Sequence, residues 1–454
     1  MRQSIAMQKL ISVLSLVIFT LLVMLPAPAS ASAPVLIRDT EIEGIIEEWA
    51  EPLVRAADLP VGGVQIILVQ SPELNAFVAG GANIFIYTGL IERTDGPGEL
   101  LGVLAHELGH IAGGHLIRGR AAMERASYES ILGTILGIGA AIASGDGAAA
   151  AAISTGASSI AARRFMAFSR VQESSADQAA LTFMDKAGMD SAGLGSFLGE
   201  LESEELLPAS RQSEYVRTHP LTSNRIAAVE TRSKESAAAG KAFPAEWVEQ
   251  HARMRAKLIG FISPEQVAWK YDDQDKGIPA RYARAIAAYR QHDVAKALKE
   301  IDSLIASEPQ NPYFQELKGQ MLVDFGQVSE AIPYYRKSVS LLKEAPLIQI
   351  ALGHALIESG DNPSNLNEAV RQLEQALIRE PRSSRAYRLL GIAYGKLGQE
   401  GKAKLNLAEE SVLQGRFDYA KDLAEGAVRT FPEGSREWLQ AKDILNYLEN
   451  RKDR

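Results

Sequence analysis

The spacing of apolar residues predicts a mainly helical protein with a small sheet near its N-terminal end. Residues 64–69 and 83–87 are short runs rich in β-branched and aromatic residues, and glycines bracket both of them. Residues 99–105 form a largely apolar run of helical character, and residues 170–184 form a second helix that ends at Gly188. We therefore expect an α+β fold, mainly helical, whose sheet forms early in the chain.

The C-terminal part of the chain repeats. His292, Gly326 and Gly360 are spaced by 34 residues, and alanines recur at the same interval. This period is typical of tetratricopeptide repeats (TPRs), in which helix pairs stack into a solenoid with a concave face for partner proteins. A generic helical bundle is the alternative. We expect an all-α TPR solenoid over residues 271–454.

Residues 1–31 have the pattern of a secretory signal peptide. Arg2 and Lys9 precede the apolar run 11–25, and Ala29-Ser30-Ala31 forms a small-residue cleavage site. An uncleaved anchor is the alternative, but the run falls short of the ~20 residues that span a bilayer. We expect export and cleavage after Ala31.

A second apolar stretch occupies residues 131–143, and a polar break at 144–147 separates it from an alanine-rich run. Each arm is too short to span a bilayer. Its small residues suit close helix packing, as in a hairpin or lid over an active site. A peripheral membrane contact through residues 131–160 is the second possibility.

Composition excludes some classes of function. The chain has 454 residues, 46% of them hydrophobic, which is enough to bury at least two cores. The formal charge is −8, and loss of Arg2 and Lys9 with the signal peptide makes it −10. An acidic chain without a run of basic residues has no evident surface for binding the phosphates of a nucleic acid. Because the chain lacks cysteine, it has neither a disulfide framework nor a lipid-modified cysteine.

The strongest chemical signal is His106-Glu107-Leu108-Gly109-His110. Two histidines four residues apart on a helix are offset by about 40°, so both rings can bind one Zn²⁺ while the intervening glutamate faces the reacting water. This spacing is the zinc-hydrolase signature. A helix with ordinary surface histidines is the alternative. The apolar run that precedes the motif favours a buried site.

The third metal ligand has to come from elsewhere. His115 lies five residues after His110, on the far side of a continuous helix from the ligand face, although Gly113-Gly114 weakens that helix. We therefore interpret His115 as either an outer partner of a ligand or a surface residue.

The best candidate is Glu173. With Asp177 it interrupts an otherwise apolar face of the helix 170–184, and buried carboxylates need a partner or a metal. Two histidines, one glutamate and one water form a known catalytic zinc set. Asp177, one turn further on, can accept the outer N–H of a ligand histidine. An ordinary solvated helix face is the alternative.

His106-Glu107-x-x-His110 followed by Glu173-x-x-x-Asp177 resembles the gluzincin metalloproteases related to HtpX and the CAAX prenyl proteases. Further runs resemble the periplasmic branch of these enzymes that carries a C-terminal TPR domain: Ile37 to Glu43, Asn75 to Val78, Gly80-Gly81, Ile84 to Leu90 and Thr218-His219-Pro220. The resemblance implies a zincin-like metalloprotease domain at residues 32–270, before the TPR domain, with one Zn²⁺ per chain.

The resemblance also implies a function. It suggests a periplasmic zinc metalloendopeptidase that degrades misfolded or stalled outer-membrane proteins and assists their assembly. Glu107 would be the general base, and residues 75–78 would lie near a cleft where an edge strand holds the substrate extended. The TPR repeats would dock the outer-membrane β-barrel assembly machinery or unfolded envelope proteins. A non-proteolytic TPR chaperone or adaptor is the alternative.

The resemblance places the loop Thr218-His219-Pro220 close to the zinc. His219 then has three possible roles. It could occupy the fourth metal position and keep the enzyme latent, donate a hydrogen bond to the transition state together with Arg225, or be a plain loop residue. We favour the latent form.

Overall fold

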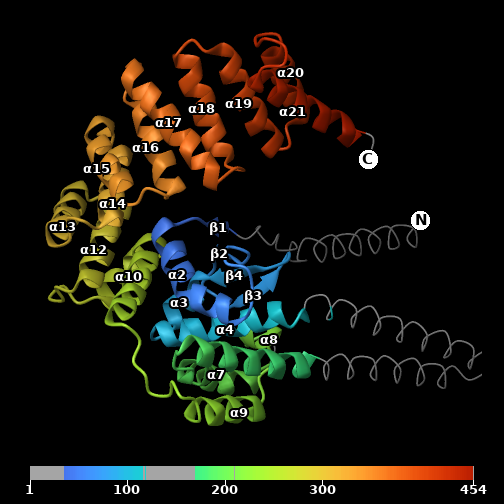
Figure 1. The fold of residues 1–454 in the computed structure, drawn as a ribbon. Coiled ribbons are helices and arrows are strands. Elements are labelled where there is room, and N and C mark those ends of the chain that lie inside the picture. The colour runs from blue at the N-terminus through green and yellow to red at the C-terminus, as the bar shows by residue number, and fades with distance from the viewer. Residues whose placement is uncertain (1–34, 116–117, 119–168, 209, 453–454) are drawn as a thin grey trace, which may run out of the picture. The chain divides into compact units, whose positions relative to one another are not determined.

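The computed structural model describes residues 35–115, 118, 169–208 and 210–452 (Figure 1). The predicted signal peptide at 1–31 and the apolar segment at 131–160 lie outside these residues. Among the described helices, none combines the length and the apolar character that crossing a bilayer requires.

The predicted early sheet is confirmed. Its strands lie in the order β1-β2-β4-β3, with β2 parallel to β4 and β3 antiparallel to β4. The predicted strands 64–69 and 83–87 correspond to β2 and β4, whereas β1 and β3 were not predicted as separate strands. The bounds are β1 Val35–Ile37, β2 Gln65–Gln70, β3 Ala76–Ala79 and β4 Asn83–Tyr87.

Helix α4 lies beside the edge strand β3 and also contacts α2 and α7. Its residues from Leu100 to Leu108 are buried because the sheet side and the α7 side both cover it. Figure 1 shows α2, α3 and α4 around the sheet, with α7 and α9 beyond α4. The helices of this region are α2 Thr40–Ala56, α3 Thr88–Arg93, α4 Pro97–Ala112, α7 Ala192–Glu205, α8 Glu214–Thr218, α9 Ser223–Lys234 and α10 Ala245–Ile262. Residues 169–187 are also helical.

A single-turn helix η1 Pro264–Gln266 and α11 Val267–Lys270 lead to the repeats, where each helix packs mainly on its neighbours in sequence. The repeat helices are α12 Ile278–Arg290, α13 Val294–Ser307, α14 Pro312–Asp324, α15 Val328–Leu341, α16 Pro346–Glu358, α17 Pro363–Arg379, α18 Ser384–Lys396, α19 Glu400–Leu413, α20 Phe417–Val428 and α21 Arg436–Lys452. The predicted TPR architecture is confirmed.

The 34-residue period has a backbone cause. His292, Gly326 and Gly360 each have a positive φ angle, of 60°, 79° and 123°. Each lies within the turn between the two helices of one repeat, where the chain needs a left-handed residue and glycine fits best. The repeated position is therefore set by the turn and not by the core.

Residues 37–454 belong to one compact unit, in which α10 packs on α12. At this contact Lys257 is buried, with its Nζ 2.8 Å from Asp39 Oδ2 and 3.0 Å from Glu41 Oε2. The hydroxyl of Tyr282 donates to the same Glu41 Oε2 at 2.8 Å. Burial alone would lower the pKa of Lys257, but Asp39 and Glu41 hold it well above its usual value, so the amine stays charged.

Candidate metal centre

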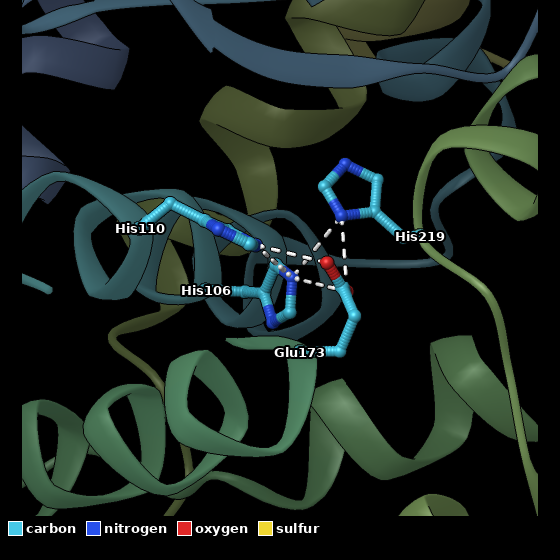
Figure 2. A group of neighbouring side chains, drawn as sticks. All are labelled: His106, His110, Glu173 and His219. Atoms are coloured by element: carbon cyan, nitrogen blue, oxygen red, sulfur yellow. Dashed lines mark hydrogen bonds and ion pairs between the residues drawn. The ribbon is translucent and has the colours of Figure 1, made fainter. Parts of the chain in front are cut away.

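Helix α4 carries His106, Glu107 and His110 into the interior. His106 is fully buried, and Glu107 is 1% exposed. The two histidine rings turn the same way, and their Nε2 atoms lie 3.0 Å apart. The one-turn spacing of the motif thus brings both rings to one point, as Figure 2 shows.

Glu173 reaches the same point from the helical residues 169–187. Its Oε2 lies 3.4 Å from His106 Nε2, and its Oε1 lies 3.5 Å from His110 Nε2. The two helices come this close because of Gly109, where an added Cβ would lie 2.7 Å from the carbonyl oxygen of Ala176. The glycine inside the motif is therefore a packing requirement of the site.

His219 completes the cluster from the C-terminal end of α8. Its Nδ1 lies 3.2 Å from Glu173 Oε2 and 3.4 Å from His106 Nε2. The donor atoms of His106, His110, Glu173 and His219 all lie within 4.8 Å of one another. Three histidines and one carboxylate form a donor set that suits Zn²⁺.

The outer ring nitrogens of these histidines are hydrogen-bonded. His106 Nδ1 donates to Asp177 Oδ1 at 2.9 Å, and His219 Nε2 donates to the carbonyl oxygen of Ala76 at 3.3 Å. Because both partners can only accept, the outer nitrogens carry the protons. The unprotonated nitrogens then face one another and the carboxylate of Glu173, an arrangement that fits a cation at their centre.

The surroundings favour a positive charge on His106 and disfavour one on His110. Burial alone would lower the pKa of His106, but Asp177 and Glu173 raise it to about 10. Burial and the neighbouring His106 lower the pKa of His110 to about 2.

Glu107 differs from the other carboxylates of the site. Neither of its oxygens has a hydrogen-bond partner among the described residues, and burial raises its pKa. The ring nitrogen Nε2 of His219 lies 3.6 Å from Glu107 Oε1, beyond hydrogen-bond distance. A buried carboxylate without a partner is costly to ionise, so Glu107 has the chemistry of a group that can accept and return a proton.

Arg225 lies behind the cluster and contacts the carboxylates. Its guanidinium is 4% exposed, donates to both oxygens of Asp177 at 2.7 and 2.9 Å, and lies 3.2 Å from Glu173 Oε2. Burial alone would raise the pKa of Asp177, but Arg225 and His106 hold it below its usual value. Asp177 therefore stays ionised as the acceptor for His106.

Sequence analysis placed residues 75–78 near the cleft, but it predicted neither the contact of Ala76 with His219 nor that of Tyr215. The ring of Tyr215 stacks on the His219 ring with centroids 4.6 Å apart, and its hydroxyl has no partner among the described residues. The carbonyl of Ala76 belongs to the edge strand β3. A backbone carbonyl leaves no signal in a sequence, and a buried tyrosine resembles any other core aromatic residue.

Comparison with known proteins agrees with this geometry. Residues 37–233 match the sequence profile of peptidase family M48, and residues 282–346 and 350–404 match tetratricopeptide repeats. A region that matches peptidase family M48 is thus followed by regions that match TPRs. Below, these two parts are the peptidase region and the repeat region.

Two of the relatives match this chain over most of its length. The beta-barrel assembly-enhancing protease of Escherichia coli strain K12 is 26% identical over 412 residues, which cover 89% of this chain and 82% of the relative. The same protease of Yersinia pestis is 24% identical and covers 93% of this chain and 86% of the relative. The metalloprotease YcaL of E. coli is 29% identical over 161 residues, 35% of this chain and 58% of that relative.

Proposed function

We propose that the chain is a zinc metalloendopeptidase in which His106, His110 and Glu173 bind one Zn²⁺. The observation that carries this proposal is the set of inward-facing donor atoms beside a buried glutamate that has no partner among the described residues. Two histidines, a carboxylate and a water are a known catalytic zinc set.

Bound Zn²⁺ would polarise the scissile carbonyl and make a water molecule acidic enough to react near neutral pH. Glu107 takes the proton of that water and delivers it to the leaving amine. Its raised pKa suits this role, because a base is most effective when its pKa lies near the working pH. Asp177 and Arg225 act through the ligands: Asp177 orients His106, and Arg225 keeps both carboxylates in place.

We further propose that His219 keeps the resting enzyme latent by supplying a fourth donor. Its Nδ1 lies at hydrogen-bond distance from Glu173 and close to His106, which supports this role. The same ring lies 3.6 Å from Glu107 Oε1, so its departure would also open space beside the base.

We propose the periplasm as the site of action and misfolded or stalled outer-membrane proteins as the substrates. The names of the beta-barrel assembly-enhancing relatives and their coverage of the whole chain support this assignment. In this proposal the signal peptide 1–31 directs export, the protease domain spans 32–270, and the repeats at 271–454 dock the outer-membrane assembly machinery or the substrate. Residues 131–160 remain a candidate lid or membrane contact.

The deciding experiment compares wild type with Glu107→Gln and Glu173→Ala, measuring bound zinc and casein cleavage. Glu107→Gln should keep its zinc and lose about 10²–10⁴-fold in rate, because general-base catalysis contributes that much. Glu173→Ala should lose zinc as well as activity. Equal cleavage by wild type and Glu107→Gln would contradict the proposed protease function and favour the alternative of a non-proteolytic TPR adaptor.

A further inference from the structure

His115 returns to the metal centre because the chain turns back after α4. The helix ends at Ala112, and Gly114 has a φ of +60°, a left-handed conformation that glycine adopts without strain. His115 is therefore 5% exposed and not on the surface. The expectation that it lies on the far side from the ligands was wrong, because it assumed that the helix continues.

The turn makes room for the imidazole of His115. A Cβ added to Gly113 would lie 2.4 Å from His115 Nε2, so the ring packs directly over the bare backbone of that glycine. From the other side, Gln172 Nε2 donates to the backbone carbonyl of His115 at 3.2 Å. Gln172 precedes Glu173, so this hydrogen bond joins the turn to the helix that carries the carboxylate.

The His115 ring contacts the outer nitrogen of His110. The two Nδ1 atoms lie 3.0 Å apart, and the rings meet edge to face with centroids 4.9 Å apart and an interplanar angle of 81°. Because His110 Nε2 faces the centre, its proton has to be on Nδ1. His115 Nδ1 is then the acceptor, and the remaining proton of His115 is on its Nε2.

We propose that His115 is a positioning residue that accepts the Nδ1 proton of His110 and thereby holds His110 Nε2 in its metal-binding tautomer. The inference rests on the proposed zinc site. It gives each histidine of the centre an acceptor of its own: a carboxylate for His106, a backbone carbonyl for His219 and a neutral imidazole for His110. Outer partners of this kind orient metal-binding histidines and typically change metal affinity 10- to 100-fold.

A pair of substitutions separates this role from simple packing. The side-chain oxygen of asparagine can take the position of histidine Nδ1, whereas glutamine reaches the position of Nε2. His115→Asn should therefore keep the acceptor for His110, and His115→Gln should lose it although it fills more space. His354→Ala, which removes a half-buried histidine of α16 in the repeat region, is the control.

The experiment measures Zn²⁺ affinity by competition with a chelator, and thermal unfolding of the metal-free proteins. All variants are made in the full chain carrying Glu107→Gln, to prevent self-cleavage. We expect His115→Ala and His115→Gln to weaken zinc binding about 10- to 100-fold, and His115→Asn and His354→Ala to stay near the parent. The metal-free variants should unfold at similar temperatures.

Two results would overturn the proposal. One is unchanged zinc affinity in His115→Gln. The other is an equal loss of affinity in the asparagine and glutamine variants. Should His115→Ala fail to fold, the comparison of asparagine with glutamine still decides. Absence of stoichiometric zinc in the parent protein would instead contradict the proposed metalloprotease, so the two failures are distinguishable.

Discussion

Glu107 and Glu173 lie beside the same centre, yet their surroundings shift their pKa values in opposite directions. Glu107 is buried without a partner, and burial raises its pKa. Burial would raise the pKa of Glu173 too, but His219 and His106 lower it below its usual value. The two carboxylates therefore suit different roles. Glu173, whose charge is stabilised by the histidines, suits a metal ligand, and Glu107, which has no such partner, suits a general base.

At the residue scale, His219→Ala should raise the basal rate of casein cleavage if the ring keeps the enzyme latent. Its hydrogen bond to the carbonyl oxygen of Ala76 contributes about 1 kcal/mol at a typical net value, which corresponds to roughly a fivefold increase. Cleavage of fluorescently labelled casein at equal zinc loading measures the change.

Arg217→Ala is the matched control, because Arg217 is an exposed neighbour on the same short helix. A lower rate in His219→Ala with zinc retained would contradict the latch and assign the ring to transition-state stabilisation, as one of the alternatives holds. An unchanged rate would leave His219 as a plain loop residue.

At the element scale, the approach of α4 to the helical residues 169–187 depends on Gly109. Gly109→Ala should destabilise the protein by about 1–3 kcal/mol, the usual cost of overpacking, since the new methyl group would press on backbone and not on a flexible side chain. Zinc affinity should fall as Glu173 is displaced. Thermal unfolding and chelator competition report the two effects.

Gly199 in α7 is the control for Gly109, because a Cβ added to Gly199 would have no neighbouring atom within 4 Å. Gly199→Ala should stabilise the helix by up to about 1 kcal/mol through its better helix propensity. If both glycine substitutions stabilise the protein, helix packing at Gly109 is looser than these distances indicate.

Sequence patterns predicted those helices and strands whose residues recur at a clear interval. The strands β2 and β4 and the repeats follow from local alternation and from the left-handed turn positions such as Gly326. The edge strand β3 has only four residues, which is too short for a period to stand out. The position of His115 depended on where α4 ends, and a helix end is decided by the turn that follows.

The residues of the candidate site likewise fall into those that a local sequence pattern predicts and those that it does not. His106 and His110 could be paired from their spacing, since one helix fixes both. Glu173 and Asp177 could be proposed because carboxylates on an apolar face need partners. The bidentate contact of Arg225 with Asp177 and the stacking of Tyr215 on His219 join segments far apart in sequence, which no local pattern reports.

At the scale of the whole molecule, we expect the repeat region to stabilise the peptidase region through the contact between α10 and α12. Ala283 and Ala287 of α12 pack with Ala256 and Ile259 of α10 in one apolar cluster. A chain that ends at residue 276 would expose that cluster and remove the Tyr282 hydroxyl from Glu41. We expect this fragment to unfold at a clearly lower temperature than the full chain, as measured by circular dichroism.

A chain that ends at residue 414 is the control, because it removes only α20 and α21. Solenoid repeats contact mainly their neighbours, so the remaining repeats should stay folded and the peptidase region should be unaffected. Equal unfolding temperatures for the two truncated chains would show that α12 adds nothing to the peptidase region.

The contact around Lys257 also determines what a break in the backbone would do. Residues 272–277 connect α11 to α12 and are exposed, yet Arg284 of α12 donates to the carbonyl oxygens of Asp272 and Asp275 at 2.8 and 2.6 Å. A nick in this connection would leave two fragments that elute together and separate only in denaturant. Cleavage of this connection would therefore not release the peptidase region from the repeat region. The two fragments would stay together until the protein unfolds globally.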